Sequence, residues 1–301
     1  MTPINPENRD TPQGLTFAVL AYFLWGFLPL YLKLLDHIPA VEIVAHRILW
    51  SVPVAGLVLI FLRRTKDLAV ALRTPRMLGM ACVTAALVSV NWGVYVWAIN
   101  TGQALEAALG YFINPLFSVA LGALLLRERL SRPQLAAIAL ATVAVVILTV
   151  EQGRLPLTAL CMTLSWGFYA FFKKWLPIGP NQGFLLEVLI LSPLAVGWLI
   201  WLAAQGSGSF AMSWGDTLLL MGSGVVTAVP LILYANGAKL VRLSTIAILQ
   251  YIAPTMIFLN AVFVFGEPMD RARMIAFPLI WAALVIYSWT LLRGMRRRSP
   301  A

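Results

Sequence analysis

Long apolar runs separated by short polar segments extend along almost the whole chain. Each run has about 20 residues, the length of a helix that crosses a bilayer at 1.5 Å per residue. Ten such runs predict ten membrane-spanning helices, at residues 15–35, 41–62, 77–98, 104–126, 133–150, 156–176, 183–204, 215–236, 243–265 and 272–292. Because most connecting segments are short, we expect antiparallel neighbours in one bundle, with no separate soluble domain.

The composition indicates an integral membrane protein. Hydrophobic residues make up 60% of the chain and charged residues only 11%, whereas soluble domains carry roughly 25% charged residues. A soluble chain with so few charges could not cover its surface. Cys82 and Cys161 fall inside apolar runs, and we interpret them as small buried apolar residues rather than a disulfide. The polar start of the chain lacks a signal-peptide pattern, so the first run should remain as a helix.

The net charge of +10 follows from the loops between the runs. In a soluble protein this charge would suggest nucleic-acid binding, but here the basic residues concentrate on one side of the predicted bundle. With the N-terminus inside the cell, 17 Lys and Arg side chains lie on the inner side and four on the outer side, and Arg47 lies within a run. The positive-inside rule therefore predicts a multi-pass protein of the cell (inner) membrane with both termini cytoplasmic, and no nucleic-acid partner.

The second half of the sequence repeats the first. Three pairs of segments align at offsets of 141 or 139 residues: LWGFLPLYLKLL (24–35) with SWGFYAFFKKWL (165–176), FINPLF (112–117) with YIAPTM (251–256), and LLRERLSR (125–132) with VFGEPMDR (264–271). These alignments match Trp25 to Trp166, Pro115 to Pro254 and Glu128 to Glu267. Five helices per half is an odd number, so the second half should enter the membrane upside down. Inverted repeats are typical of secondary transporters, which bind substrate near the midplane of the membrane.

The repeat gives the expected division of the chain. We expect a cytoplasmic tail over 1–14, a first five-helix repeat over 15–150, a second, inverted five-helix repeat over 151–292 and a basic cytoplasmic tail over 293–301. The predicted fold class is therefore an all-α integral membrane protein with ten transmembrane helices.

Four motifs resemble those of a known transporter family: EIVAHRILWS (42–51), NWGVYVWAIN (91–100), LEAALGYFINPL (105–116) and LSTIAILQYIAPT (243–255). Over residues 14–292 the chain resembles the EamA-type transporters of the drug/metabolite transporter superfamily and, within them, the RarD permeases. The resemblance implies ten helices in two inverted repeats around a central cavity. RarD permeases are linked to chloramphenicol sensitivity or resistance, and export is the usual direction in related families.

Three polar side chains stand close together in one apolar run: Glu42, His46 and Arg47. An Arg at the centre of a membrane helix costs about 2.5–3.5 kcal/mol. Arg47 either clamps Glu42, backbone carbonyls or a neighbouring helix, or faces the cavity and binds an anionic substrate. His46 either carries a proton or packs. Glu106, in the first turn of its helix, is either favoured there by the helix dipole or, like Glu42, a gating or proton-linked carboxylate.

Pro115 and Pro254, which we expect to act as gating positions, interrupt two apolar runs at matching depths. Each removes a backbone hydrogen bond, and the freed carbonyl must face protein or a wet cavity. The adjacent polar side chains predict cavity lining, with a purely structural kink as the alternative: Tyr111, Asn114, Gln250 and Tyr251. Aromatic residues within the runs are further candidates, although Trp and Tyr also serve as interface anchors or packing: Trp25, Trp92, Tyr95, Trp166 and Tyr234. Asn91 contacts either substrate or an adjacent helix.

The motifs that the sequence lacks narrow the function. It has no HExxH, GxSxG or paired intramembrane aspartates, so we expect neither an enzyme nor a metal or cofactor site. It also has no Walker motif, which leaves an ion gradient or facilitated diffusion as the driving force. The predicted function is an exporter or facilitator of a small organic, amino-acid-like or drug-like molecule by alternating access. The alternative is a non-transporting membrane sensor or accessory subunit with the same fold.

Overall fold

The computed structural model describes residues 11–298, apart from residues 64, 127–130, 154, 176–177 and 242–248. The described chain is helical, with α1 (Pro12–Lys33), α2 (Ala40–Phe61), α3 (Thr65–Arg73), α4 (Pro75–Asn100), α5 (Ala104–Leu126), α6 (Arg132–Gln152), α7 (Leu157–Trp175), α8 (Pro180–Ala204), α9 (Trp214–Leu240), α11 (Ile252–Leu259), the π-helix η1 (Asn260–Val264) and α12 (Arg271–Arg298). Among the described residues, seven helices are long and apolar enough to cross a membrane: α1, α2, α4, α6, α8, α9 and α12.

The ten predicted apolar runs all coincide with helices, and most of the differences lie at their ends. Pro12 already begins α1, within the predicted N-terminal tail, and α12 continues to Arg298 instead of ending at 292. The run over 243–265 begins in undescribed residues, and its described part is α11 followed by η1. The sequence did not predict α3, a short amphipathic helix whose Leu68 and Ala71 pack on its neighbours.

Local sequence explains where several helices begin and end. Thr11 accepts a hydrogen bond from the backbone N–H of Gly14 at 3.1 Å and is followed by Pro12, a combination that favours a helix start. Ser131 and Gln134 form a capping box at the start of α6. Gly153 ends α6 at φ +63°, a left-handed conformation that costs glycine little.

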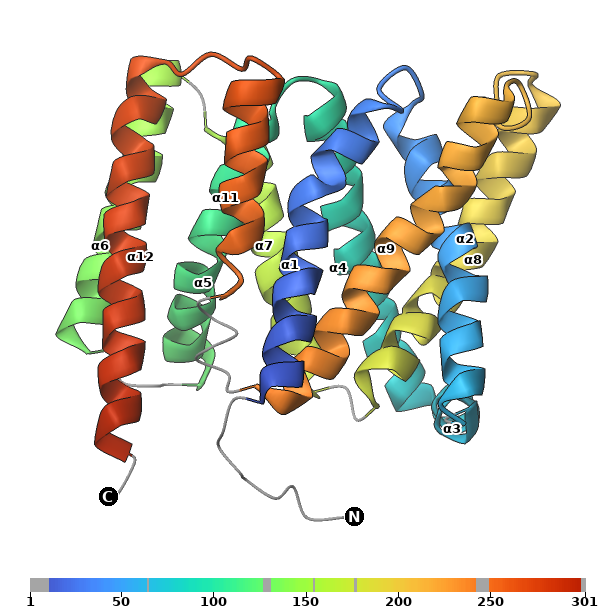
Figure 1. The fold of residues 1–301 in the computed structure, drawn as a ribbon, viewed down its shortest axis with the longest axis horizontal. Coiled ribbons are helices and arrows are strands. Elements are labelled where there is room, and N and C mark those ends of the chain that lie inside the picture. Colours follow the sequence, from blue (N-terminus) through green and yellow to red (C-terminus); the bar gives the residue numbers. More distant parts are fainter. Residues whose placement is uncertain are drawn as a thin grey trace.

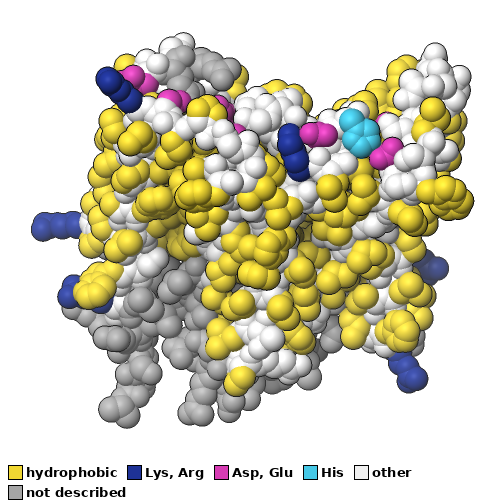
Figure 2. Space-filling view, turned by 45° about the horizontal axis from the view of Figure 1, so that its top comes forward, with side chains coloured by type: hydrophobic (Ala, Val, Ile, Leu, Met, Phe, Trp, Pro, Cys, Tyr) yellow, Lys and Arg dark blue, Asp and Glu magenta, His cyan; other side chains and the backbone are white. Residues whose placement is uncertain are grey.

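The helices form one bundle in which successive long helices run in opposite directions (Figure 1). We call the lower end in this view, where α1 begins and α12 ends, the termini side; the upper end, where α1 joins α2 and α11 joins α12 through short loops, is the opposite side. Hydrophobic side chains cover much of the outer surface, and charged side chains gather toward its margins (Figure 2). Cys82 and Cys161 are free; Cys82 is exposed and Cys161 half-buried, so the expectation that both are buried is wrong for Cys82 and met only in part for Cys161. A thiol is apolar enough to face lipid tails.

Two three-helix bundles surround the centre of the molecule. The first consists of α4, α5 and α7, and the second of α1, α9 and α11. Helix α2 packs against α8 and α9 at one end of the molecule, and α6 packs against α12 at the other (Figure 1). Close contact within the first bundle depends on Gly110, because a methyl group there would lie 2.7 Å from the carbonyl oxygen of Ala159. Small residues at such contacts let membrane helices pack closely.

Candidate functional site

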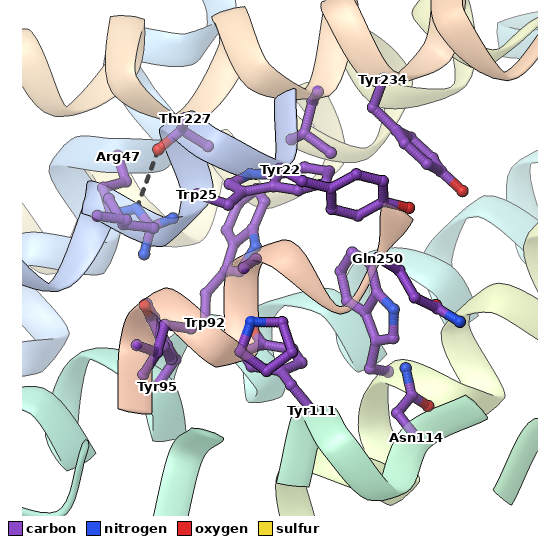
Figure 3. Close-up of a pocket in the computed structure, with 16 residues that line it drawn as sticks. Tyr22, Trp25, Arg47, Trp92, Tyr95, Tyr111, Asn114, Thr227, Tyr234 and Gln250 are labelled. Carbon is purple, nitrogen blue, oxygen red and sulfur yellow. Dashed lines mark hydrogen bonds between the residues drawn. The ribbon is translucent and has the colours of Figure 1, made fainter. Parts of the chain in front are cut away.

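A cavity lies between the two bundles, and its walls come from both halves of the chain (Figure 3). Nine of the twelve residues predicted to bind substrate line it: Trp25, Arg47, Trp92, Tyr95, Tyr111, Asn114, Trp166, Tyr234 and Gln250. Pro254 lines it as well, whereas Pro115 does not. The described chain therefore gathers residues from α1, α2, α4, α5, α7, α9 and α11 around one space.

Arg47 is the cation of this cavity. Its side chain is 3% exposed, its Nε donates a hydrogen bond to Thr227 Oγ1 at 3.0 Å, and its Cζ lies 5.2 Å from the centroid of the Trp92 ring. Among the described residues Nη1 has no hydrogen-bond partner. A cation over a desolvated aromatic ring gains about 2 kcal/mol, which offsets only part of the cost of burying a charge. The guanidinium thus keeps an N–H group available for an anion.

Glu42 does not supply that anion. Its carboxylate accepts hydrogen bonds from Ser209, at 2.6 Å from the backbone N–H and 3.1 Å from the hydroxyl. Glu42 therefore fastens the α8–α9 loop to the start of α2, and the clamp between Glu42 and Arg47 that the sequence left open is not formed. Within the described part of the chain, no ion pair involves Arg47.

Aromatic rings from both bundles form a connected wall of the cavity. Trp25 and Trp166 meet edge to face with centroids 6.5 Å apart. On one side Trp25 contacts Tyr22 at 5.5 Å and Tyr234 at 5.6 Å. On the other, Tyr111 contacts Trp166 at 6.3 Å and Tyr95 at 5.7 Å. This wall offers a large apolar and polarisable surface to the body of a ligand.

The polar groups of the cavity lie at two ends of the aromatic wall (Figure 3). Arg47 and Thr227 lie at one end, and Asn114 and Gln250 lie together at the other. The side-chain oxygen of Asn114 is buried and has no hydrogen-bond partner among the described residues. A ligand that bridges the two ends would meet a cation at one and a hydrogen-bond acceptor at the other.

Asn91 lies behind the cavity wall rather than in it. It accepts a hydrogen bond from the Tyr111 hydroxyl at 3.2 Å. Its amide nitrogen donates to Ser165 Oγ at 3.0 Å and to the Met162 carbonyl at 3.2 Å. Asn91 thereby joins α4 to α7 and orients a ring that does line the cavity. Of the two roles that the sequence left open, the contact is to an adjacent helix.

The remaining predicted residues also lie outside the cavity lining. The His46 ring stacks on Phe210 of the α8–α9 loop at 4.9 Å, and its Nδ1 accepts a hydrogen bond from Trp50 Nε1 at 3.2 Å. Tyr251 precedes α11 as its N-cap residue. Glu106 is buried in the first turn of α5. Among the described residues no group of His, Cys, Asp and Glu side chains could hold a metal ion.

Sequence reasoning missed several lining residues: Tyr22, Leu28, Thr227, Leu231, Ala253 and Ile257. Tyr22 precedes Trp25 by three positions on α1, so the shared helix face was a usable signal. Thr227 carries no comparable signal, because its role depends on Arg47, 180 positions away.

A largely buried ion pair adjoins the cavity. Lys173 Nζ lies 2.6 Å from Glu187 Oε1, and the Tyr169 hydroxyl donates to the other carboxylate oxygen at 3.2 Å. Tyr169 in turn packs on Trp166, a lining residue, with ring centroids 5.3 Å apart. The pair connects α7 to α8, and the Lys173 ammonium compensates the charge of the buried Glu187 carboxylate.

Comparisons with known proteins agree with this architecture. The EamA-like transporter family matches residues 12–150. The chain is 45% identical to "Protein RarD" of Streptomyces exfoliatus over 94% of this chain and 90% of that protein. It is 37% identical to "Protein RarD" of Escherichia coli over 97% and 99%.

A solved structure, described only as "Crystal structure of protein", shares the fold with a TM-score of 0.62 at 18% identity. The match covers 92% of this chain and 98% of that one. The chain therefore belongs to the EamA-like transporter family, as a homologue of the RarD proteins, and is a multi-pass membrane transporter rather than an enzyme.

Proposed function

We propose that this transporter is a carrier for a small amphipathic carboxylate, amino-acid-like in size, and that it works as an exporter or facilitator by alternating access around the central cavity. The observation that carries the proposal is the buried guanidinium of Arg47, which lines an aromatic cavity and has no carboxylate partner among the described residues. The carboxylate of a substrate would supply the missing negative charge.

The chemistry of Arg47 favours a carboxylate over a neutral ligand. A guanidinium binds a carboxylate through charge-assisted and often bidentate hydrogen bonds, which are roughly twice as strong as neutral ones. The Thr227 hydroxyl accepts from Nε and the centroid of the Trp92 ring lies 5.2 Å from Cζ, so two contacts orient the group before a ligand arrives. Such preorganisation lowers the entropy cost of binding.

The rest of the cavity suits the other parts of such a molecule. The Trp25 and Trp166 rings offer an apolar surface at the centre. The buried Asn114 oxygen offers an acceptor for an ammonium or hydroxyl group. A ligand with a carboxylate, an apolar body and a donor group would satisfy all three features at once, as an amino acid does.

The pairing of helices supports two inverted repeats over 15–150 and 151–292. The sequence repeat matches α1 to α7, α2 to α8, α4 to α9, α5 to α11 and α6 to α12. Under this exchange the packing of α1 on α9 becomes that of α7 on α4, and the packing of α1 on α11 becomes that of α7 on α5. The contacts of α2 with α8 and of α6 with α12 map onto themselves. Rocking of two such related bundles is a common transport mechanism.

The orientation and energy source complete the proposal. The excess of Lys and Arg on the predicted inner side of the sequence, 17 against four, supports cytoplasmic termini in the cell (inner) membrane. Because the sequence has no ATP-binding motif, the concentration gradient of the substrate or of a coupled ion would drive transport.

Thermal unfolding of the purified protein in detergent tests the site. Amino acids, aromatic carboxylates and amphenicols would be screened with wild type, Arg47→Ala and the matched control Arg76→Ala, which removes an exposed Arg. A ligand at 100 times its dissociation constant stabilises the folded state by about 2.7 kcal/mol. We expect carboxylates to stabilise wild type and Arg76→Ala but not Arg47→Ala. Equal stabilisation of all three proteins would show that Arg47 does not bind the ligand.

A further inference from the structure

The carboxylate of Glu267 joins the two bundles at the opposite side of the molecule. Glu267 lies in the loop between η1 and α12, and its Oε1 and Oε2 accept the backbone N–H groups of Ala104 at 2.6 Å and Leu105 at 2.9 Å. These N–H groups belong to the first two residues of α5, and the first N–H donors of a helix have no partner within it. A carboxylate at this position also interacts favourably with the helix dipole.

Glu267 itself is held firmly in the α1–α9–α11 bundle. Its backbone N–H donates to the Ala261 carbonyl at 2.9 Å, within the π-helix η1. At the start of η1, the Asn260 amide donates to the Gly26 carbonyl of α1 at 2.9 Å. The chain reverses through Gly266 at φ +68°, a conformation that glycine adopts readily. Glu267 is therefore anchored in the α1–α9–α11 bundle while its carboxylate contacts α5 of the other bundle.

Buried apolar side chains gather at the same end of the molecule as Glu267. Leu35, Ile38, Ile99 and Leu105 are at most 1% exposed, and all lie near the ends of their helices or in the α1–α2 loop on that side. The Asn100 amide also donates to the Ile38 carbonyl at 3.4 Å. Hydrogen bonds from Glu267 and from Asn100 thus cross the boundary between the bundles at this apolar end.

We propose that Glu267 is the latch of a gate on the opposite side. Its hydrogen bonds to α5 stabilise the state in which the cavity is closed there, and they break when the bundles separate. This inference rests on the alternating-access carrier proposed above. A hydrogen bond between two groups that can both return to water contributes only modestly to the net free energy, so the contact suits a gate that must open repeatedly.

The latch makes a prediction about access that requires no substrate. In a Cys82→Ala, Cys161→Ala background, Leu28→Cys places a reporter thiol in the cavity lining. A charged, membrane-impermeant thiol reagent would be applied to reconstituted vesicles from the opposite side alone. Glu267→Gln should accelerate labelling roughly tenfold, because a hydrogen bond to a charged group contributes about that factor to an equilibrium. The control Asp270→Asn removes an exposed carboxylate that caps α12 within the same half and should leave the rate unchanged.

A second variant keeps the test decisive if Glu267→Gln does not fold. Ala104→Pro removes one of the two donors at the first position of α5, where helices accept proline, and leaves every charge in place. It should also accelerate labelling from the opposite side. Labelling at the wild-type rate in a folded Glu267→Gln or Ala104→Pro protein would overturn the latch. Failure of the carboxylate proposal would instead appear as absent ligand stabilisation, with the labelling result unchanged.

Discussion

Trp25 and Trp166 meet at the centre of the molecule with their ring planes at 81° and their centroids 6.5 Å apart. One belongs to α1 and the other to α7, so each contributes to a different bundle. The same two residues are matched by the sequence repeat. The aromatic wall of the cavity is therefore continuous across the boundary at which the bundles would move.

Both tryptophans should contribute about equally to ligand binding. Trp25→Ala and Trp166→Ala each remove one partner of the edge-to-face contact, worth about 0.5–1.5 kcal/mol beyond area burial, together with apolar contact to the ligand. We expect each to weaken carboxylate binding by about tenfold or more, measured by titration of the purified protein. The control Trp214→Ala changes an exposed residue at the start of α9 and should have no effect on binding. Wild-type affinity in both cavity variants would show that the aromatic wall does not contact the ligand.

Asn91 and Tyr111 should be energetically coupled. Asn91→Ala takes away the acceptor of the Tyr111 hydroxyl and one of the two hydrogen bonds of the Ser165 hydroxyl, which still donates to the Cys161 carbonyl at 2.6 Å. An unsatisfied buried polar group costs about 1–3 kcal/mol. In the Asn91→Ala, Tyr111→Phe double variant one of those groups is gone, so the total loss of thermal stability should be less than the sum of the single losses. Strict additivity would contradict the positioning role of Asn91.

Removing one partner of the Lys173–Glu187 pair should destabilise the fold far more than replacing both partners. Glu187→Gln or Lys173→Met alone leaves one buried charge uncompensated, and breaking a buried pair costs about 3–5 kcal/mol. The double variant removes both charges and should recover most of that loss in a thermal unfolding measurement. A double variant as unstable as the sum of the singles would show that the two charges do not compensate each other.

Two glycines should respond in opposite ways to the same substitution. Gly110→Ala places a methyl group against Ala159 and Met162, and such overpacking costs about 1–3 kcal/mol. Gly56→Ala meets no atom within 4 Å and should stabilise α2 by about 0.5–1 kcal/mol. Thermal unfolding of the two variants compares them directly, and equal stability would contradict the close packing of α5 on α7.

The positions of most helices could be predicted because one property, the length of an apolar run, largely decides where a membrane helix forms. The helix α3 escaped prediction because its nine residues are amphipathic and too short for that criterion. The π-helix η1 escaped because its residues, Asn260–Val264, read as an ordinary apolar segment. Its local geometry accompanies the contact between Asn260 and α1, which no local pattern encodes.

The candidate site was predictable in part for a similar reason. Polar groups within a membrane helix are costly unless they meet a cavity or each other, and most of the polar and aromatic residues singled out do line the cavity. Neighbours on one helix are harder to separate. His46 and Arg47 differ by about 100° around α2, so Arg47 faces Thr227 and Trp92 whereas His46 faces Phe210. Only the packing of α2 against α8 and α9 decides which of the two reaches the cavity.

The central claim is that Arg47 binds the carboxylate of the transported molecule. Proteoliposomes would be loaded with the carboxylate that stabilises the protein most, and exchange with labelled external molecules would be measured for that carboxylate and for its uncharged amide. The account predicts saturable exchange of the carboxylate by wild type, little exchange of the amide, and loss of this preference in Arg47→Gln with folding intact. Equal exchange of acid and amide by wild type, or an unchanged preference in Arg47→Gln, would contradict it.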